Sequence, residues 1–274
     1  MAELTALSPS RANDFLQCPL KFRFRSVDRL PEPPSPAAFK GTLVHAVLEQ
    51  LFDAESERRT YETALALLPG CYEQLTSATP ELAEMYPDEQ AVRTLLGEAA
   101  ALLRAYFGLE LPDRLEPAER ESFVTVTLDS GLELRGFIDR VDVAPGGQVR
   151  LVDYKTGKQP RPQYGREADF QMRFYALLRY RRDGVLVHTL QLMYLGSGSI
   201  KSYRPTLADI ERTEAEVRGI WDEITSCART GNWRPQKSKL CDWCSFKELC
   251  PAWGNQAPAA PEITRIAGTE VAPA

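Results

Sequence analysis

Residues 136–158, GFIDRVDVAPGGQVRLVDYKTGK, restrict the local fold more than any other stretch of this chain. Val141 and Val143 alternate with charged residues, residues 144–147 (APGG) interrupt the alternation, and apolar positions return across residues 149–155. This order is typical of a strand, a turn and a second strand. The stretch therefore predicts a β-hairpin.

The register of this hairpin places two acids side by side. If the turn is centred on Gly146, Asp142 pairs with Arg150, and Asp139 pairs with Asp153. Directly opposed side chains have Cβ atoms roughly 4.5 to 5.5 Å apart, where like charges repel. A divalent cation between the two acids would reverse the sign of this interaction. Lys155 follows Asp153 by two residues and so shares its face of the strand. A solvated hairpin with charged residues on its outer face is the alternative.

The chain as a whole indicates a soluble globular protein. Its 274 residues suffice for one large domain or two small ones, and its 43% hydrophobic content is ordinary. We find no apolar run long enough to span a membrane, and the N-terminal residues lack the pattern of a secretory signal. We expect a cytoplasmic location, where six cysteines are better explained as thiols or metal ligands than as disulfides.

Charge is unevenly distributed along the chain, although the net charge is only -5. Residues 49–121 contain 16 acidic and 6 basic side chains, whereas residues 155–182 contain 8 basic and 2 acidic ones. The basic excess directly follows the Asp-x-Lys strand, where a polyanion would have to lie. A solvated basic helix face explains the same pattern without a ligand.

Local signals divide the rest of the chain into elements. Ser8 and Pro9 predict a helix that ends near Cys18, PEPPSPAAF at 31–39 predicts a linker, and a second helix is expected from about Gly41. Residues 55–115 read as a helical layer or insertion, with breaks at Pro69-Gly70 and at Pro80. The rest of the sequence predicts strands at 122–128, 132–143, 149–155 and 186–195, helices at 167–182 and 206–228, and a flexible tail at 255–274.

Three polar residues on helices are ambiguous by themselves. His45 lies at the margin of an apolar helix face, where it could pack or reach a cation. Gln171 and Tyr175 are spaced i, i+4 and share a helix face directly after the Asp-x-Lys strand. By themselves, structural roles are the commoner explanation for all three.

Three cysteines, Cys241, Cys244 and Cys250, form C-x2-C-x5-C, which is a specific metal-ligand signal. A fourth ligand is needed. Cys18 is attractive because it ends a helix and precedes a proline as Cys250 does, whereas Cys71 and Cys227 fall within helical patterns and suit burial. Zinc and a [4Fe-4S] cluster both accept four thiolates, so spacing leaves both open.

Six motifs follow one another along the chain: S-x-S-x-x-x-x-F-x-x-C-P, G-x-x-x-H, G-x-I-D-R-x-D, D-Y-K-T-G, Q-x-x-x-Y and C-x2-C-x5-C-P. Together they resemble the RecB-family exonucleases of the PD-(D/E)XK superfamily, and specifically the iron-sulfur branch that includes the nuclease module of AddB and the CRISPR adaptation nucleases. The resemblance covers residues 7–251. It implies an α/β restriction-endonuclease-like core, a mixed central sheet flanked by helices. This core would form a single nuclease domain at 1–254, with a helical insertion at 55–115 and a cysteine clasp at residues 18 and 241–250.

The resemblance also implies roles for individual residues. His45, Asp139 and Asp153 would bind the catalytic Mg²⁺ or Mn²⁺, helped by the backbone carbonyl of Tyr154. Lys155 would position or polarise the attacking water. The remaining roles are implied as follows: Gln171 and Tyr175 hold the DNA backbone or support the site, and Cys18, Cys241, Cys244 and Cys250 ligate a [4Fe-4S] cluster. A glutamate before the first strand often joins such sites, and both Glu119 and Glu121 stay outside this prediction.

The expected function is a Mg²⁺- or Mn²⁺-dependent exonuclease that acts on single-stranded DNA ends in repair or recombination. Four basic residues are expected to contact phosphates: Lys158, Arg161, Arg166 and Arg173. We find no G-x-x-x-x-G-K-[ST] motif, so a helicase or repair-complex partner would be a separate chain. The alternative is a catalytically silent subunit that binds DNA ends or acts as a scaffold in a helicase-nuclease or CRISPR adaptation complex.

Overall fold

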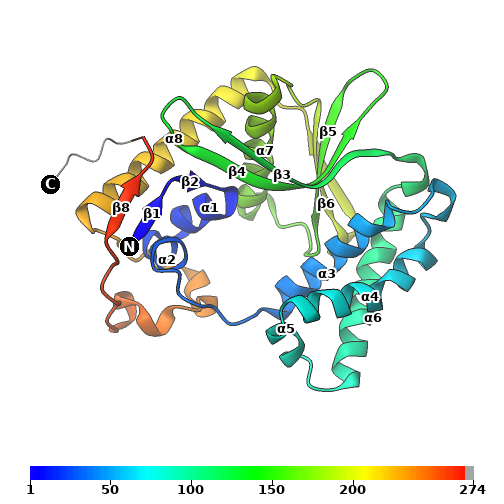
Figure 1. Cartoon of the computed structure of the whole chain (residues 1–274), viewed down its shortest axis with the longest axis horizontal. Coiled ribbons are helices and arrows are strands. Elements are labelled where there is room, and N and C mark those ends of the chain that lie inside the picture. Colours follow the sequence, from blue (N-terminus) through cyan, green and yellow to red (C-terminus); the bar gives the residue numbers. More distant parts are fainter. Residues whose placement is uncertain (269–274) are drawn as a thin grey trace.

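A computed structural model describes residues 1–268. A mixed sheet in the order β2-β4-β5-β6-β7, with β3 paired to β4, forms the centre, and β1 and β8 form a separate two-stranded sheet (Figure 1). The strands are β1 Ala2–Leu4, β2 Ala6–Leu7, β3 Pro117–Thr127, β4 Glu133–Val143, β5 Val149–Lys155, β6 Thr189–Tyr194, β7 Ser199–Tyr203 and β8 Ile263–Ile266. The α-helices are α1 Pro9–Gln17, α2 Pro19–Phe22, α3 Pro36–Leu51, α4 Tyr61–Ala78, α5 Glu81–Glu84, α6 Glu89–Leu109, α7 Arg166–Asp183 and α8 Leu207–Thr230. This mixed sheet flanked by helices is the predicted fold class.

Strands β5 and β6 lie at the middle of the molecule because both of their faces are covered. They run parallel, joined by the crossover helix α7. Leu151 and Leu190 belong to one apolar core with α1, α7 and α8, whereas Val152 and Met193 belong to a second core with α3, α4 and α6. Nearly every β5 side chain is buried, as expected for a strand covered on both sides. The sheet is therefore a rigid base for side chains at its strand ends.

Helices α1 and α3 begin at capping residues, and α3 therefore begins earlier than predicted. Ser8 caps α1 as predicted, its hydroxyl accepting the Arg11 N–H at 3.3 Å. The predicted start of the second helix at Gly41 is wrong, because Ser35 and Pro36 form the same cap and first-residue pair and start α3 five residues earlier. Part of the expected linker at 31–39 is thus helical.

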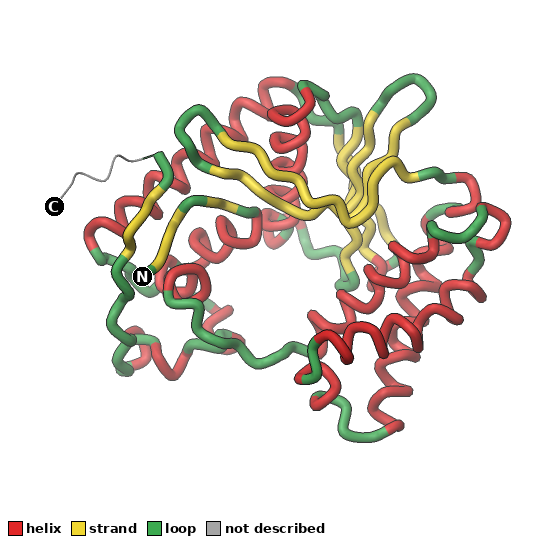
Figure 2. The backbone as a smooth tube through the Cα atoms, viewed as in Figure 1, coloured by secondary structure: helices red, strands yellow, loops and turns green. Residues whose placement is uncertain are grey.

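Two other expectations are corrected. The break at Pro69 is wrong: α4 continues through it, because Ala64, Leu68 and Cys71 hold the helix in the second core on both sides of the proline. The break at Pro80 is confirmed, since α4 ends at Ala78 and α5 begins at Glu81. Residues 56–114 are mainly helical and lie together on one side of the sheet with α3 (Figure 2).

The flexible tail expected at 255–274 is wrong for residues 263–266. These residues form β8, which pairs in parallel with β1 at the other end of the chain. A two-residue β2 and the strand β7 are further elements that the alternation pattern did not indicate. The last part of the expected tail, residues 269–274, lies outside the described residues. Among the helices of residues 1–268, none is long and apolar enough to cross a bilayer.

Candidate active site

The hairpin of β4 and β5 brings the two predicted acids together. Its ladder pairs Asp142 with Arg150 and Val141 with Leu151, as predicted, and Asp139 and Asp153 occupy the next positions in this register beyond the last paired residues. The Asp139 Oδ2 accepts the backbone N–H of Tyr154 at 2.7 Å. Burial and the negative charge of Asp153 raise the pKa of Asp139 above its ordinary value. The fold therefore brings two carboxylates near enough for their charges to repel each other.

His45 approaches the same point from α3. The predicted apolar face of this helix is buried, which fixes the orientation of the imidazole. The His45 Nδ1 lies 3.6 Å from Asp139 Oδ2 and 3.5 Å from Glu121 Oε1, and its Nε2 lies 3.0 Å from the Tyr154 carbonyl oxygen. Burial opposes protonation, but the hydrogen bond to Glu121 and the charges of Asp139, Glu121 and Asp153 raise the pKa of His45 to about 9.

Glu121 completes this group, although our sequence analysis left it out. On β3 its neighbours Arg120 and Ser122 pair with Arg140 and Ile138, so Glu121 lies opposite Asp139. Its φ of 41° is in the left-handed region, which residues other than glycine rarely adopt. Such strain concentrates at functional sites. Aligning the two predicted strands at 122–128 and 132–143 with each other could have identified this residue.

Glu119, the other acid left open, has a different role. Its carboxylate pairs with Arg179 and Arg182 of α7 and accepts a hydrogen bond from Ser122. It therefore ties β3 to α7, and Glu121 is the glutamate at the site.

A second polar group connects the end of β5 to α7. The Lys155 Nζ lies 2.8 Å from Asp153 Oδ2 and donates to Gln171 Oε1 at 2.7 Å. The Gln171 amide nitrogen donates to Asp153 Oδ1 at 2.9 Å and to the Tyr175 hydroxyl at 2.8 Å. The i, i+4 spacing of Gln171 and Tyr175 thus places both at the Asp-x-Lys strand.

The acidic group fits a hard divalent cation. His45, Glu121 and Asp139 each offer a ligand atom within 4.8 Å of the others. Asp153 Oδ2 is buried, and within residues 1–268 no hydrogen bond of good geometry reaches it, although the Lys155 ammonium is close. Carboxylate oxygens with one imidazole suit Mg²⁺ or Mn²⁺. A cation here would neutralise the converging carboxylates.

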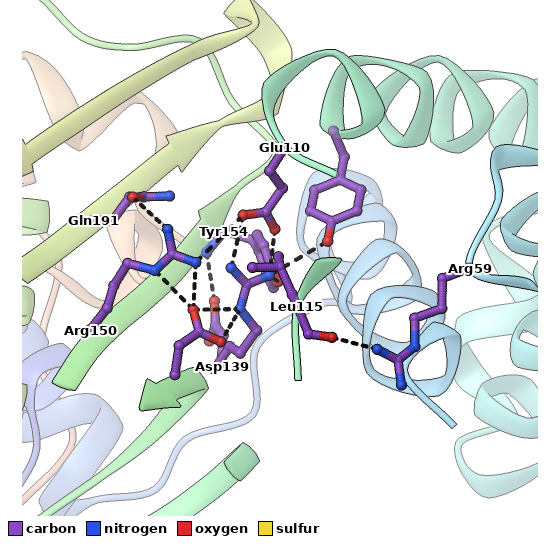
Figure 3. A network of polar contacts seen from close by, with 10 residues as sticks. Arg59, Glu110, Leu115, Asp139, Arg150, Tyr154 and Gln191 are labelled. Atoms are coloured by element: carbon purple, nitrogen blue, oxygen red, sulfur yellow. Dashed lines mark hydrogen bonds and ion pairs between the residues drawn. The ribbon is translucent and has the colours of Figure 1, made fainter. Parts of the chain in front are cut away.

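A buried arginine, Arg140, supports the hairpin through a polar network that includes Glu110, Tyr154 and Arg150 (Figure 3). Arg140 is 1% exposed and donates to Glu110, after α6, at 2.9 Å and to the Tyr154 hydroxyl at 2.6 Å. Its Nε lies 3.1 Å from Asp142, which also pairs with Arg150 at 2.8 Å. The backbone of Tyr154 contacts both Asp139 and His45, so this network positions the site.

The four predicted cysteines come together although they are far apart in sequence. Cys18 lies between α1 and α2 and, with Cys241, Cys244 and Cys250, lines a cavity of about 240 Å³. Burial and the neighbouring Cys18, Cys244 and Cys241 sulfurs raise the pKa of the Cys250 thiol. Backbone N–H groups of Gln236 and Ser238 donate to the sulfurs of Cys18 and Cys241, at 3.3 and 3.4 Å. Cys71, by contrast, is buried in the second core, and Cys227 is half-buried against the first.

The predicted phosphate-contacting residues differ in their surroundings. Lys158, Arg161 and Arg166 are exposed along the segment that leads into α7. Arg173 is already paired with Glu216 of α8 at 2.7 Å. A cavity of about 860 Å³ opens at Lys155, Gln171 and Tyr175, and α1, β3 and β4 also contribute to its walls.

Two acids that converge from the two strands of a hairpin, the second of them in an Asp-x-Lys sequence, are typical of a metal-dependent nuclease. The chain belongs to the PD-(D/E)XK nuclease superfamily, whose family model matches residues 6–251. This membership implies DNA binding and the use of divalent metals, and it supports the RecB-family resemblance. The assignment to the iron-sulfur branch stays a prediction.

Similar proteins span nearly the whole chain. The Gene 69 protein of Mycobacterium phage D29 is 26% identical, over 88% of this chain and 95% of its own length. The Gene 69 protein of Mycobacterium phage L5 is 23% identical, over 90% of this chain and 96% of its own. The crystal structure of a "Putative exonuclease" from Eubacterium rectale matches with a TM-score of 0.56 at 15% identity, over 94% of this chain and 90% of that one. This last likeness supports the fold.

Proposed function

We propose that this protein is a Mg²⁺- or Mn²⁺-dependent deoxyribonuclease that hydrolyses single-stranded DNA from its ends, in DNA repair or recombination. The observation that carries the proposal is the convergence of Asp139 and Asp153 beside Lys155. Without a cation this arrangement costs free energy, and with one it is a phosphodiester-cleaving site. The repair setting rests on the RecB-family resemblance.

Each residue at the site has a specific part in this proposal. Asp139, Asp153 and His45 would hold the cation together with Glu121, and the Tyr154 carbonyl, 3.0 Å from His45 Nε2, would orient the imidazole. When bound, the cation lowers the pKa of a coordinated water and offsets negative charge on the phosphate. The remaining groups act as follows: Lys155 donates a hydrogen bond to the attacking water or a phosphate oxygen, Gln171 orients both Lys155 and Asp153, and Tyr175 holds Gln171.

A preference for strand ends is supported by the surroundings of the cavity. Lys158 and Arg161, on the segment before α7, and Arg166, its first residue, are exposed and lie within two positions in sequence of residues that line the cavity. The cavity has walls from α1, α7, β3 and β4. A free end of a flexible strand meets fewer steric obstacles between these walls than a continuous duplex does.

The four clustered cysteines are proposed to hold a [4Fe-4S] cluster. The four residues line one cavity of about 240 Å³, and four thiolates suit either zinc or an iron-sulfur cluster. The choice of iron-sulfur rests on the RecB-family resemblance. Protein purified without oxygen should be brown, whereas a zinc protein would be colourless.

The test is hydrolysis of labelled single-stranded DNA, either linear, blocked at one end or circular, with Mg²⁺ or Mn²⁺. The wild type should degrade linear strands and spare circles. Asp153→Asn and Lys155→Ala should lose roughly 100-fold or more in rate, while Glu211→Gln on the exposed face of α8 should behave as wild type. Equal degradation by all four proteins would overturn the proposal. DNA that is bound but left uncut with either metal would favour a scaffolding subunit instead.

A further inference from the structure

We propose that Phe123 of β3 and Phe137 of β4 form a platform on which the bases of single-stranded nucleic acid stack next to the cleaved phosphate. The inference deepens the proposed nuclease function and rests on it. Its starting point is that both rings are large, apolar and half exposed, at 51% and 57% of their surface.

The two rings form one surface. Phe123 and Phe137 are direct cross-strand partners, and their ring centroids lie 4.9 Å apart with 44° between the ring planes. Their sequence neighbours Val124 and Ile138 are buried in the core. Val124 and Ile138 therefore already pack these strands into the core, and the two phenylalanines lie outside it. A cross-strand aromatic pair does stabilise a hairpin, but that role does not require this location.

The location is what connects the pair to the chemistry. Phe137 lies two residues before Asp139 on β4, and Phe123 lies two residues after Glu121 on β3. At about 3.4 Å per residue along a strand, the Cα atom of each phenylalanine lies roughly 7 Å from the Cα atom of an acid of the metal site. Both rings line the same 860 Å³ cavity as Lys155, Gln171 and Tyr175. A phosphate held at the metal site would thus place a neighbouring base near the rings.

The other cavity walls suit the same ligand. Arg135 lies two residues before Phe137 and lines the cavity; its side chain is 38% exposed, and its long 3.8 Å contact with the exposed Glu133 leaves it able to reach a neighbouring phosphate. Tyr164, 72% exposed, supplies a further ring across from the strands. Exposed aromatic rings interleaved with cations along a groove are the usual means of binding single strands without sequence preference.

The proposed ligand is an unpaired strand because a phenyl ring must reach the face of a base. In a duplex these faces are covered by neighbouring base pairs, and only edges are open. Stacking on an aromatic side chain is worth about 1 to 3 kcal/mol per base, which is about 5- to 150-fold in affinity. The platform would therefore give the nuclease much of its preference for single strands.

The test compares KM and kcat of the wild type, Phe123→Ala, Phe137→Ala, the double alanine variant and the double tryptophan variant. Leu207→Ala, an equally exposed apolar residue at the start of α8, is the matched control. Substrates are a single-stranded oligonucleotide, the same strand with abasic sites near its end, and bis(p-nitrophenyl) phosphate, which has no base to stack. Melting temperatures verify that every variant is folded.

The platform predicts that the double alanine variant raises KM for the normal strand by at least fivefold, with little change on bis(p-nitrophenyl) phosphate. Tryptophan at both positions should restore KM. Abasic sites should raise the KM of the wild type by as much as the double alanine substitution raises the KM for the normal strand. Unchanged KM in the double alanine variant, or equal use of normal and abasic strands by the wild type, would overturn the platform. A wild type that hydrolyses none of the substrates would instead refute the proposed nuclease function.

Discussion

Glu121 shows how much of this site depends on single side chains. Its left-handed backbone conformation is unfavourable for a glutamate, yet it brings the carboxylate within 3.5 Å of His45 and opposite Asp139. Local strain of this kind costs about 1 to 3 kcal/mol and persists where the surrounding structure imposes it. We interpret the strain as part of assembling the cation site.

Glu121→Gln should therefore weaken metal binding more than it lowers the stability of the fold. The concentration of Mn²⁺ that gives half-maximal nuclease activity should rise roughly 10- to 100-fold, the range seen when a group that tunes a metal site is removed. Glu119→Gln is the matched control, since it breaks pairing to α7 and should lower the melting temperature while keeping the metal requirement. The same metal requirement in Glu121→Gln and wild type would exclude Glu121 from the site.

The raised pKa values at the site predict a pH-dependent response to metal. Asp139, with its pKa raised, binds a proton more tightly when folded than when unfolded, so metal-free protein loses stability as pH rises above the ordinary aspartate range. The His45 contribution is complete below about 6.5 and is lost as pH rises through about 9. Because a cation must displace both protons, the rise in melting temperature caused by Mg²⁺ should grow from pH 6 to pH 9. Thermal melts in EDTA and in Mg²⁺ would measure this, and a constant shift across that range would contradict it.

At the scale of elements, the contact between β4 and α7 transmits packing to the site. A Cβ added at Gly136 would lie 2.7 Å from the Tyr175 ring, closer than real atoms approach. Gly136 is thus required by the close approach of α7, which explains the glycine of the G-x-I-D motif.

Gly136→Ala should displace Tyr175 and, through it, Gln171. We expect kcat to fall about tenfold or more, because a small misplacement of positioning groups is costly in a preorganised site. Gly219→Ala, on α8 with open space around its Cβ position, is the control and should leave kcat unchanged. Nuclease rates at saturating metal provide the measurement, and a fully active Gly136→Ala would refute the proposed role of Tyr175.

The buried Arg140 joins α6, β4 and β5, and its removal should strongly destabilise the fold. Arg140→Ala leaves Glu110 and Asp142 without their buried partner and should reduce the free energy of unfolding by about 3 to 5 kcal/mol. Arg150→Ala, whose side chain is 30% exposed, should cost about 1 kcal/mol or less. Urea denaturation distinguishes the two, and similar losses for both would show that the network is not a buried support.

The sequence predicted local features well and distant pairings poorly, for a physical reason. The β4–β5 register and the Ser8 cap depend on neighbouring residues, and both are confirmed. Continuation of α4 through Pro69 depends on tertiary contacts that outweigh local propensity. Glu121 could not be chosen over Glu119 because β3 had to be aligned with β4, and β8 was missed because its partner lies at the opposite end of the chain.

At the scale of the whole molecule, the two ends of the chain are brought together twice. β8 lies beside β1 (Figure 1), and Cys241, Cys244 and Cys250 line one cavity with Cys18. If a cluster joins these cysteines, it closes a loop of more than 200 residues, and the disulfide loop-entropy relation gives about 5 kcal/mol as an upper estimate for such a closure.

Cys18→Ser and Cys241→Ser should therefore lower the melting temperature by several degrees and remove the brown colour of the protein. Cys227→Ser, half-buried against the first core, is the matched control and should keep both. Iron analysis and thermal melts of anaerobically purified protein measure the effect. Colour and stability retained in Cys18→Ser would exclude this cysteine as a ligand.

The central claim is that a divalent cation lies between the carboxylates of β4 and β5. Its most direct test is an anomalous difference map from crystals of the whole protein grown with Mn²⁺. The account predicts a peak bonded to Asp139 and Asp153, with His45 and Glu121 as its further ligands. A map with no peak at these carboxylates, from protein that still cleaves DNA with Mn²⁺, would contradict it.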